Sequence, residues 1–223
     1  MAFAESQLLY RIFSEKISSG VAIIPAASII VCSPIQGDAK GFRVLMLKRN
    51  NRGPFGGLMV FPGGALDPAD HSPEWLTILD NPISKALAFK VAAIREAFEE
   101  CGLNVFKPDL KLPVNEIAQW RKSVHDDGTK LLEMAKTTGC VPDLNRLGLY
   151  SNWITPAVES KRFDTWFYVY VSPKAVSSLR LHADEGTLKN CQHLDINTII
   201  STYRNSVNLS RVFNPPIESL DSS

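Results

Sequence analysis

The feature that most constrains this 223-residue chain is the run KVAAIREAFEECGL, residues 90–103. Its apolar residues recur at helical spacing, so we expect a helix from about Lys85 to Cys101 that ends at Gly102. One side of that helix is apolar and faces the core. The nearly opposite side carries three glutamates, Glu96, Glu99 and Glu100. Any fold for this chain must place that acidic stripe where its repulsion is tolerated.

The spacing brings the three carboxylates within ~5–6 Å of one another, and each like-charge pair costs about a few tenths of a kcal/mol. Two explanations are open. The stripe is either the solvated face of an amphipathic helix or a site for a divalent cation, Mg²⁺ or Mn²⁺, which prefers oxygen ligands and substrate phosphates. In the second case, we expect Arg95 at the edge of the stripe to orient a glutamate through a charge-assisted bond.

The segment VFPGG, residues 60–64, lies upstream of the helix. Glycine lets a backbone approach a ligand closely, so Gly63 and Gly64 are candidate substrate-binding residues. Arg49 and Arg52 flank the loop before this segment. A planar guanidinium suits bidentate contact with phosphate, and the alternative is that both arginines are solvated surface charges.

The run REAFEECGL, residues 95–103, resembles the second half of the Nudix box and meets each of its fixed positions. The preceding VFPGG resembles the strand and turn that come before the box. On these two segments the chain is identified as a member of the Nudix hydrolase superfamily. The resemblance implies a diphosphatase in which Glu96, Glu99 and Glu100 bind Mg²⁺ or Mn²⁺, with Glu99 and Arg95 in catalytic roles.

The sequence departs from the standard box between Gly64 and Arg95, where the spacing is more than twice the usual length. The first glutamate of the box has no clear counterpart. Counting back from Arg95 reaches Leu87, and counting forward from Gly64 reaches Asp70, which serves only if the insertion brings it close. Farther along, Glu185 resembles the late glutamate of many Nudix enzymes and is either a general base or a plain loop carboxylate.

Most of the domain, roughly residues 24–200, resembles one Nudix branch, the coenzyme A diphosphatases. This resemblance implies hydrolysis of CoA or acyl-CoA to 3′,5′-ADP and (acyl-)4′-phosphopantetheine. Two alternatives stay open: a Nudix hydrolase of another nucleoside diphosphate derivative, such as ADP-ribose or NADH, and a Nudix-fold binding module that no longer cleaves. The retained pair Glu99 and Glu100 argues against the module, because a dead copy has no reason to keep costly carboxylates together.

Segments rich in β-branched and aromatic residues come before, between and after the helical patterns, which predicts an α/β protein with a mixed sheet. The resemblance implies the Nudix-type α/β/α sandwich with an insertion inside the Nudix box. We divide the chain into an N-terminal helix over residues 1–20, a Nudix hydrolase domain over 21–205 and a C-terminal tail over 206–223. Tryptophans such as Trp153 are expected in the core rather than against a base.

The formal net charge is +1, which gives no electrostatic reason to expect a nucleic-acid partner, so we expect a small-molecule nucleotide substrate. No apolar run approaches the ~18 residues needed to span a membrane. The four cysteines form no CxxC pair, which is typical of reduced thiols inside the cell. The resembled branch is peroxisomal, yet the ending ESLDSS matches no such signal, so the cytosol and the mitochondrion are alternatives. Nothing in the sequence indicates the oligomeric state.

Overall fold

The computed structural model describes residues 21–35, 37–49, 57–79, 85–157, 159–173, 188–194 and 198. The expected N-terminal helix over 1–20 and the C-terminal tail over 206–223 lie outside these described residues. So do the candidate site residues Arg52 and Glu185. Expectations about those parts of the chain stay predictions.

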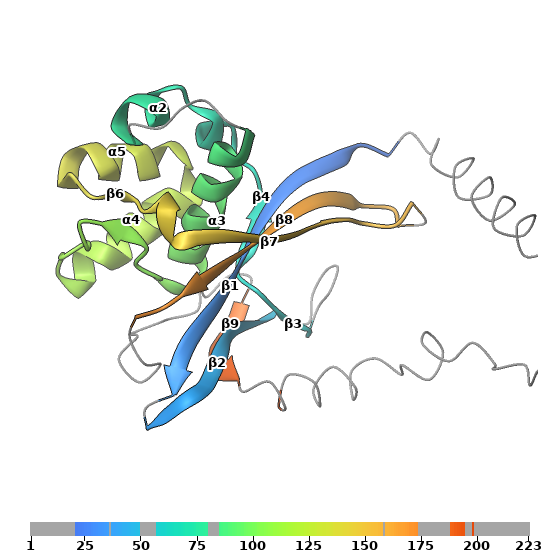
Figure 1. Cartoon of the computed structure of the whole chain (residues 1–223). Coiled ribbons are helices and arrows are strands. Elements are labelled where there is room, and N and C mark those ends of the chain that lie inside the picture. The colour runs from blue at the N-terminus through green and yellow to red at the C-terminus, as the bar shows by residue number, and fades with distance from the viewer. Residues whose placement is uncertain are drawn as a thin grey trace, which may run out of the picture.

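A seven-stranded mixed sheet forms the centre of the described chain (Figure 1). Its main path runs β3 (Met59–Val60), β2 (Asp38–Arg49), β1 (Ile23–Ile35), β8 (Arg162–Val171) and β7 (Leu147–Ile154). In addition, β4 (Gly63–Ala65) pairs with β1, and β9 (Leu188–Leu194) pairs with β2. Strands β1 and β8 are parallel and the other pairs are antiparallel, so the predicted mixed sheet is confirmed.

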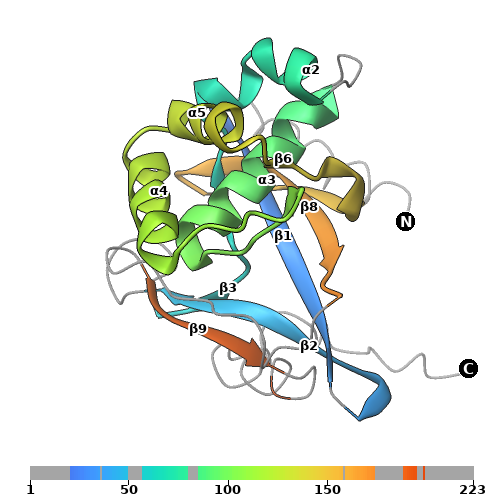
Figure 2. The same cartoon turned by 90° about the vertical axis from the view of Figure 1, so that its left-hand side faces the viewer.

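Helices gather on one side of this sheet (Figures 1 and 2). They are α2 (Glu74–Leu79), α3 (Lys85–Cys101), α4 (Val114–Asp126) and α5 (Thr129–Thr138), with the short 3₁₀ turns η1 (Pro68–His71) and η2 (Leu144–Arg146). A small separate sheet joins β5 (Phe106–Lys107) to β6 (Val141–Pro142). In the described part of the chain, no helix combines the length and apolar character needed to cross a membrane.

Helix α3 is the centre of the core, because it lies between the sheet and the other helices. Its predicted apolar face is buried, and small residues on its other sides are buried as well, including Ala92, Ala93 and Ala97. The predicted end is confirmed: Gly102 has a φ of 72°, and its N–H donates to the Phe98 carbonyl at 2.9 Å. The sequence pattern indicates an amphipathic helix. In the structure, however, other elements pack against several sides of α3.

The two faces of strand β1 contact different parts of the protein, because side chains alternate between the faces along a strand. Ala27, Ile29 and Val31 belong to the buried core. Ser28 and Ile30 line a pocket on the other face of the sheet. The sheet therefore separates the helical core from the surface that carries the pocket.

The predicted tight turn at Gly63 and Gly64 is instead strand β4, which pairs antiparallel with β1. Gly63 has a φ of 154°, and a Cβ there would lie 2.4 Å from the Ala27 carbonyl oxygen and 2.7 Å from Ser28 Cα. No residue with a side chain fits this position without a shift of the backbone. Glycine is thus required for the close approach of β4 to β1.

Candidate active site

Arg95 is the hub of a buried ionic cluster at the centre of α3. Its Nε and Nη2 each donate to one Asp70 carboxylate oxygen at 2.9 Å. Its Nη1 donates to Glu99 Oε1 at 2.8 Å and to Glu96 Oε1 at 2.9 Å. One guanidinium thus orients three carboxylates through charge-assisted bonds, which is the geometry expected for a residue that positions glutamates.

The inserted segment brings Asp70 into this cluster, whereas Leu87 lies in the hydrophobic core. The local sequence Asp-Pro-Ala-Asp builds the turn η1. Asp67 accepts the N–H of Ala69, and Asp70 Oδ2 accepts the N–H of Asp67, each at 2.8 Å. This capping box fixes the orientation of the Asp70 carboxylate, which also accepts the hydrogen bonds of Arg95. The Asp-x-x-Asp pattern of this capping box is visible in the sequence. It is a signal that favours Asp70 over Leu87 as the counterpart of the first glutamate of the Nudix box.

The glutamate stripe is not a solvated helix face. The side chains of Glu96 and Glu99 are 13% and 7% exposed. Helix α4 covers part of the stripe, and His125 Nδ1 lies 3.6 Å from Glu99 Oε2. From the same helix, Arg121 donates to the backbone carbonyl of Glu99 at 2.8 Å. The first of the two explanations, that the stripe is the solvated face of an amphipathic helix, is therefore wrong.

Glu96 and Glu100 are directed toward strand β4, while Glu99 is turned toward Arg95 and α4. The Gly63 N–H donates to Glu100 Oε2 at 2.9 Å. At Gly64, a Cβ would lie 2.7 Å from the carboxylate of Glu96. The two candidate glycines thus contact the glutamates directly, and glycine at position 64 leaves the space that the Glu96 carboxylate occupies.

Burial raises the pKa of all three glutamates. It raises the pKa of Glu96 to about 7 although the Arg95 charge opposes it, and it raises that of Glu99 against the same opposition. The pKa of Glu100 is raised well above its usual value, first by burial and then by the negative charge of Glu96. Desolvation therefore outweighs the nearby positive charge of Arg95 and Arg49, and it disfavours the charged forms of these carboxylates.

This donor set fits Mg²⁺ or Mn²⁺, since clustered carboxylate oxygens are the ligands that hard divalent cations prefer. Glu96 and Glu100 each keep one oxygen without a hydrogen bond to the described residues. Among those residues, no three His, Cys, Asp or Glu side chains form a ready-made metal cluster. Glu99 itself is paired with Arg95 and lies near His125.

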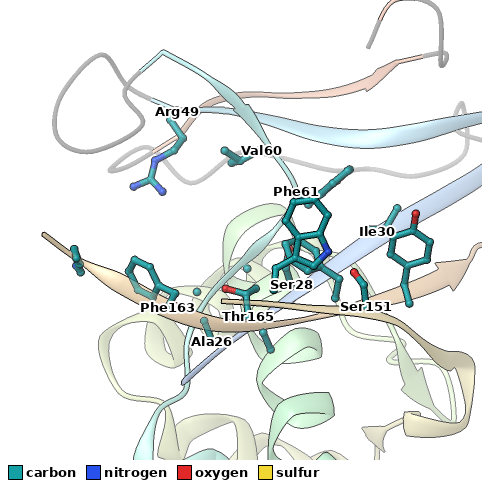
Figure 3. Close-up of a pocket in the computed structure, with 16 residues that line it drawn as sticks. Ala26, Ser28, Ile30, Arg49, Val60, Phe61, Ser151, Phe163 and Thr165 are labelled. Atoms are coloured by element: carbon teal, nitrogen blue, oxygen red, sulfur yellow. The ribbon is translucent and has the colours of Figure 1, made fainter. Parts of the chain in front are cut away.

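A pocket of about 620 Å³ lies on the face of the sheet away from α3 (Figure 3). Gly63 and Gly64 form part of its wall, so the pocket and the glutamates meet at β4. Its aromatic lining residues are Phe61, Tyr150, Trp153, Phe163 and Phe167. The expectation of a core position is wrong for Trp153, whose side chain is a pocket wall with 68% exposure.

Arg49 also lines this pocket, whereas Arg52 and Glu185 lie outside the described residues. The Arg49 side chain extends into the pocket in Figure 3, and its Nε is buried with no hydrogen-bond partner among the described residues. Its positive charge lowers the pKa of Glu100 and so partly offsets the effect of burial. A cation close to the glutamates, with one buried N–H that has no hydrogen-bond partner among the described residues, can bind an anionic ligand.

Comparison with known proteins identifies related sequences. Residues 78–208 match the family model described as the NUDT19 Nudix domain. The acyl-coenzyme A diphosphatase NUDT19 of Homo sapiens is 31% identical over 180 residues, covering 59% of this chain and 48% of that protein. The Gallus gallus protein of the same name is 29% identical over 180 residues, covering 57% and 48%. The chain thus spans about half the length of the curated relatives it matches.

A similar solved structure is that of a NUDIX hydrolase from Alicyclobacillus acidocaldarius. It has a TM-score of 0.69 and 25% sequence identity, and the match covers 84% of this chain and 85% of that one. The similarity therefore extends over most of this chain.

Proposed function

The chain belongs to the NUDT19 Nudix domain family of Nudix hydrolases, and from that premise we propose that it hydrolyses the diphosphate of CoA or acyl-CoA. The products would be 3′,5′-ADP and (acyl-)4′-phosphopantetheine. The observation that carries the proposal is the position of Glu96 and Glu100 directly behind Gly63 and Gly64, which form part of the wall of a pocket. The names of the curated relatives support the same substrate class.

We propose Mg²⁺ or Mn²⁺ as the cofactor, held by Glu96 and Glu100 together with Glu99. When bound, such an ion neutralises charge on the phosphoryl oxygens and lowers the pKa of water at the site. The buried position of the glutamates supports this assignment, because desolvation disfavours their charged forms and a bound cation would offset that cost.

Side chains of the protein position the metal-binding carboxylates and supply positive charge for the substrate phosphates. Arg95, fixed by Asp70, holds the carboxylates of Glu96 and Glu99 in place. Arg49 binds a phosphate of the substrate, a role supported by its unpaired Nε at the pocket. Arg52 as a second phosphate ligand and Glu185 as an assisting general base are proposals that rest on the sequence.

A substrate panel tests the proposal. The purified chain is incubated with Mg²⁺ and CoA, an acyl-CoA, ADP-ribose or NADH, and the nucleotide products are separated by chromatography. We expect 3′,5′-ADP from CoA and acyl-CoA, and no product after a chelator is added. AMP from ADP-ribose or NADH without product from CoA would reject the CoA assignment. Binding of these ligands without any product would instead favour a non-catalytic module.

A further inference from the structure

The pocket beside β4 has two chemically different ends (Figure 3). We call the part formed by Arg49, Lys161 and Phe163 the phosphate end, and the part formed by Phe61, Trp153 and Phe167 the aromatic end. Phe163 and Phe167 lie on the same strand, four residues apart, which corresponds to roughly 13 Å. In Figure 3, Arg49 and Phe163 are seen at one side of the pocket, and Phe61 lies toward the other.

The phosphate end is positively charged. Lys161 Nζ lies 5.3 Å from the centroid of the Phe163 ring, and Lys161 forms no ion pair with a described carboxylate. Among the described residues that line the pocket, the charged ones are Arg49 and Lys161, and none is acidic. A ligand group bound here is therefore expected to be an anion.

The aromatic end is apolar and built around Phe167. Its ring centroid lies 6.4 Å from that of Phe61 and 6.4 Å from that of Trp153, both in edge-on arrangements. A register shift in β7 between Leu149 and Ser151 pairs Trp153 with Thr165, a pocket residue of β8. Bulges of this kind redirect side chains, and here one brings a large indole onto the pocket. Such a surface favours an apolar chain over a phosphate.

The glutamates lie close to the aromatic end. Gly64 and Gly63 pair with Ala27 and Ser28, which pair in turn with Trp166 and Phe167 of β8, so both glycines are level with the aromatic end and away from Phe163. The pocket therefore has the Lys161 cation on one side of β4, and its apolar end begins at β4 itself. In CoA, likewise, a 3′-phosphorylated nucleoside lies on one side of the diphosphate and the pantetheine arm lies on the other.

Building on the proposed function, we propose that the substrate lies in one direction along this pocket. The 3′-phosphate contacts Lys161 at the phosphate end, and the pantetheine or acyl arm lies on the aromatic end. Lys161 is then the residue that distinguishes a 3′-phosphorylated nucleotide from one without that phosphate. Trp153 favours substrates with a long apolar arm.

Lys161→Gln tests the phosphate end with CoA and 3′-dephospho-CoA as paired substrates. We expect kcat/KM for CoA to fall about tenfold, mainly through KM, because a hydrogen bond to a charged group is lost. The value for 3′-dephospho-CoA should stay unchanged. Lys107→Gln, an exposed lysine on β5, is the matched control and should alter neither value.

The possible failures are distinguishable. If the wild type hydrolyses CoA but Lys161→Gln affects both substrates equally or neither, this inference is overturned and the proposed function stands. If the wild type hydrolyses neither substrate, the proposed function fails and the inference falls with it.

Trp153→Ala tests the other end with free CoA and a medium-chain acyl-CoA. We expect KM to rise about fivefold for the acyl-CoA and less for CoA, because an aromatic contact with the arm is lost. Leu149→Ala, an exposed residue of the same strand outside the pocket, is the control. If Trp153→Ala instead alters the ratio between CoA and 3′-dephospho-CoA, the substrate lies in the opposite direction.

Discussion

At the scale of single residues, the candidate site depends on Arg95, which pairs with Asp70, Glu96 and Glu99. These groups are almost fully buried, so each charge depends on its partner for compensation. Removing one partner of a buried ion pair costs roughly 3–5 kcal/mol, because it leaves the other charge uncompensated. The cluster is therefore sensitive to changes of one atom or one charge.

Asp70→Asn should destabilise the protein by roughly 3 kcal/mol, because the Arg95 guanidinium loses its bidentate anionic partner. The free energy of unfolding in urea measures this. Asp126→Asn breaks an exposed pair with Lys122 and is the matched control, for which we expect little change. Equal midpoints for the two variants would show that Asp70 does not stabilise the cluster.

Glu99→Gln should reduce kcat by about a hundredfold or more while leaving the fold intact, since the amide keeps the shape but loses the charge. Turnover of CoA and the circular dichroism spectrum check both parts of this statement. Glu133→Gln, on the exposed side of α5, should leave kcat unchanged. Full activity in Glu99→Gln would remove this residue from the site.

At the scale of elements, β4 brings the carboxylates next to the pocket. Its two glycines pass between the pocket and the side chains of Glu96 and Glu100, and the backbone of Gly63 holds Glu100 by a hydrogen bond. A Cβ at Gly63 would collide with the backbone of β1, and a Cβ at Gly64 would collide with the Glu96 carboxylate. Strand β4 is short, but the absence of side chains at these two positions is essential.

Gly64→Ala should lower kcat by roughly tenfold or more, because the added methyl group would lie 2.7 Å from the Glu96 carboxylate and displace it. Steady-state kinetics with CoA measures the effect. Gly148→Ala is the control, since a Cβ there meets nothing within 4 Å. If both variants keep wild-type kcat, close contact between β4 and Glu96 is not needed for catalysis.

The sequence predicts the elements whose signals are local. Helix α3 has its period, its stripe and its Gly102 end within one continuous run, and all three agree with the structure. The pairing of β4 with β1 and the contact of Asp70 with Arg95 join segments 25 or more residues apart. Hydrophobic periodicity does not encode such contacts, so the sequence predicts a turn at the glycines and does not decide between Asp70 and Leu87. The position of Trp153 depends on a register shift, which the sequence does not reveal either.

At the scale of the whole molecule, the fold buries acidic groups in surroundings where desolvation disfavours their charged forms. The pKa of Glu96 is raised to about 7, and those of Glu99 and Glu100 are also raised. Between their ordinary value of 4.5 and these raised values, the folded state holds protons that the unfolded state has released. Stability therefore decreases as the pH rises through this interval.

Without a divalent cation, we expect the melting temperature to fall as the pH rises from about 5 to 8. Added Mn²⁺ should restore much of the loss at the upper end, because a ligand that binds the folded state stabilises it. Scanning calorimetry at several pH values, with and without Mn²⁺, gives the comparison. In Glu96→Gln the pH dependence should be smaller. A melting temperature that rises over this interval would contradict the assigned shifts.

The most direct test of the central claim is the amount of Mn²⁺ bound by the wild type and by Glu96→Gln and Glu100→Gln, measured by electron paramagnetic resonance. We expect that the wild type binds Mn²⁺ and that each substitution removes most of this binding, while Glu133→Gln leaves it unchanged. Equal binding by all four proteins would contradict the claim that the glutamates behind β4 form the metal site.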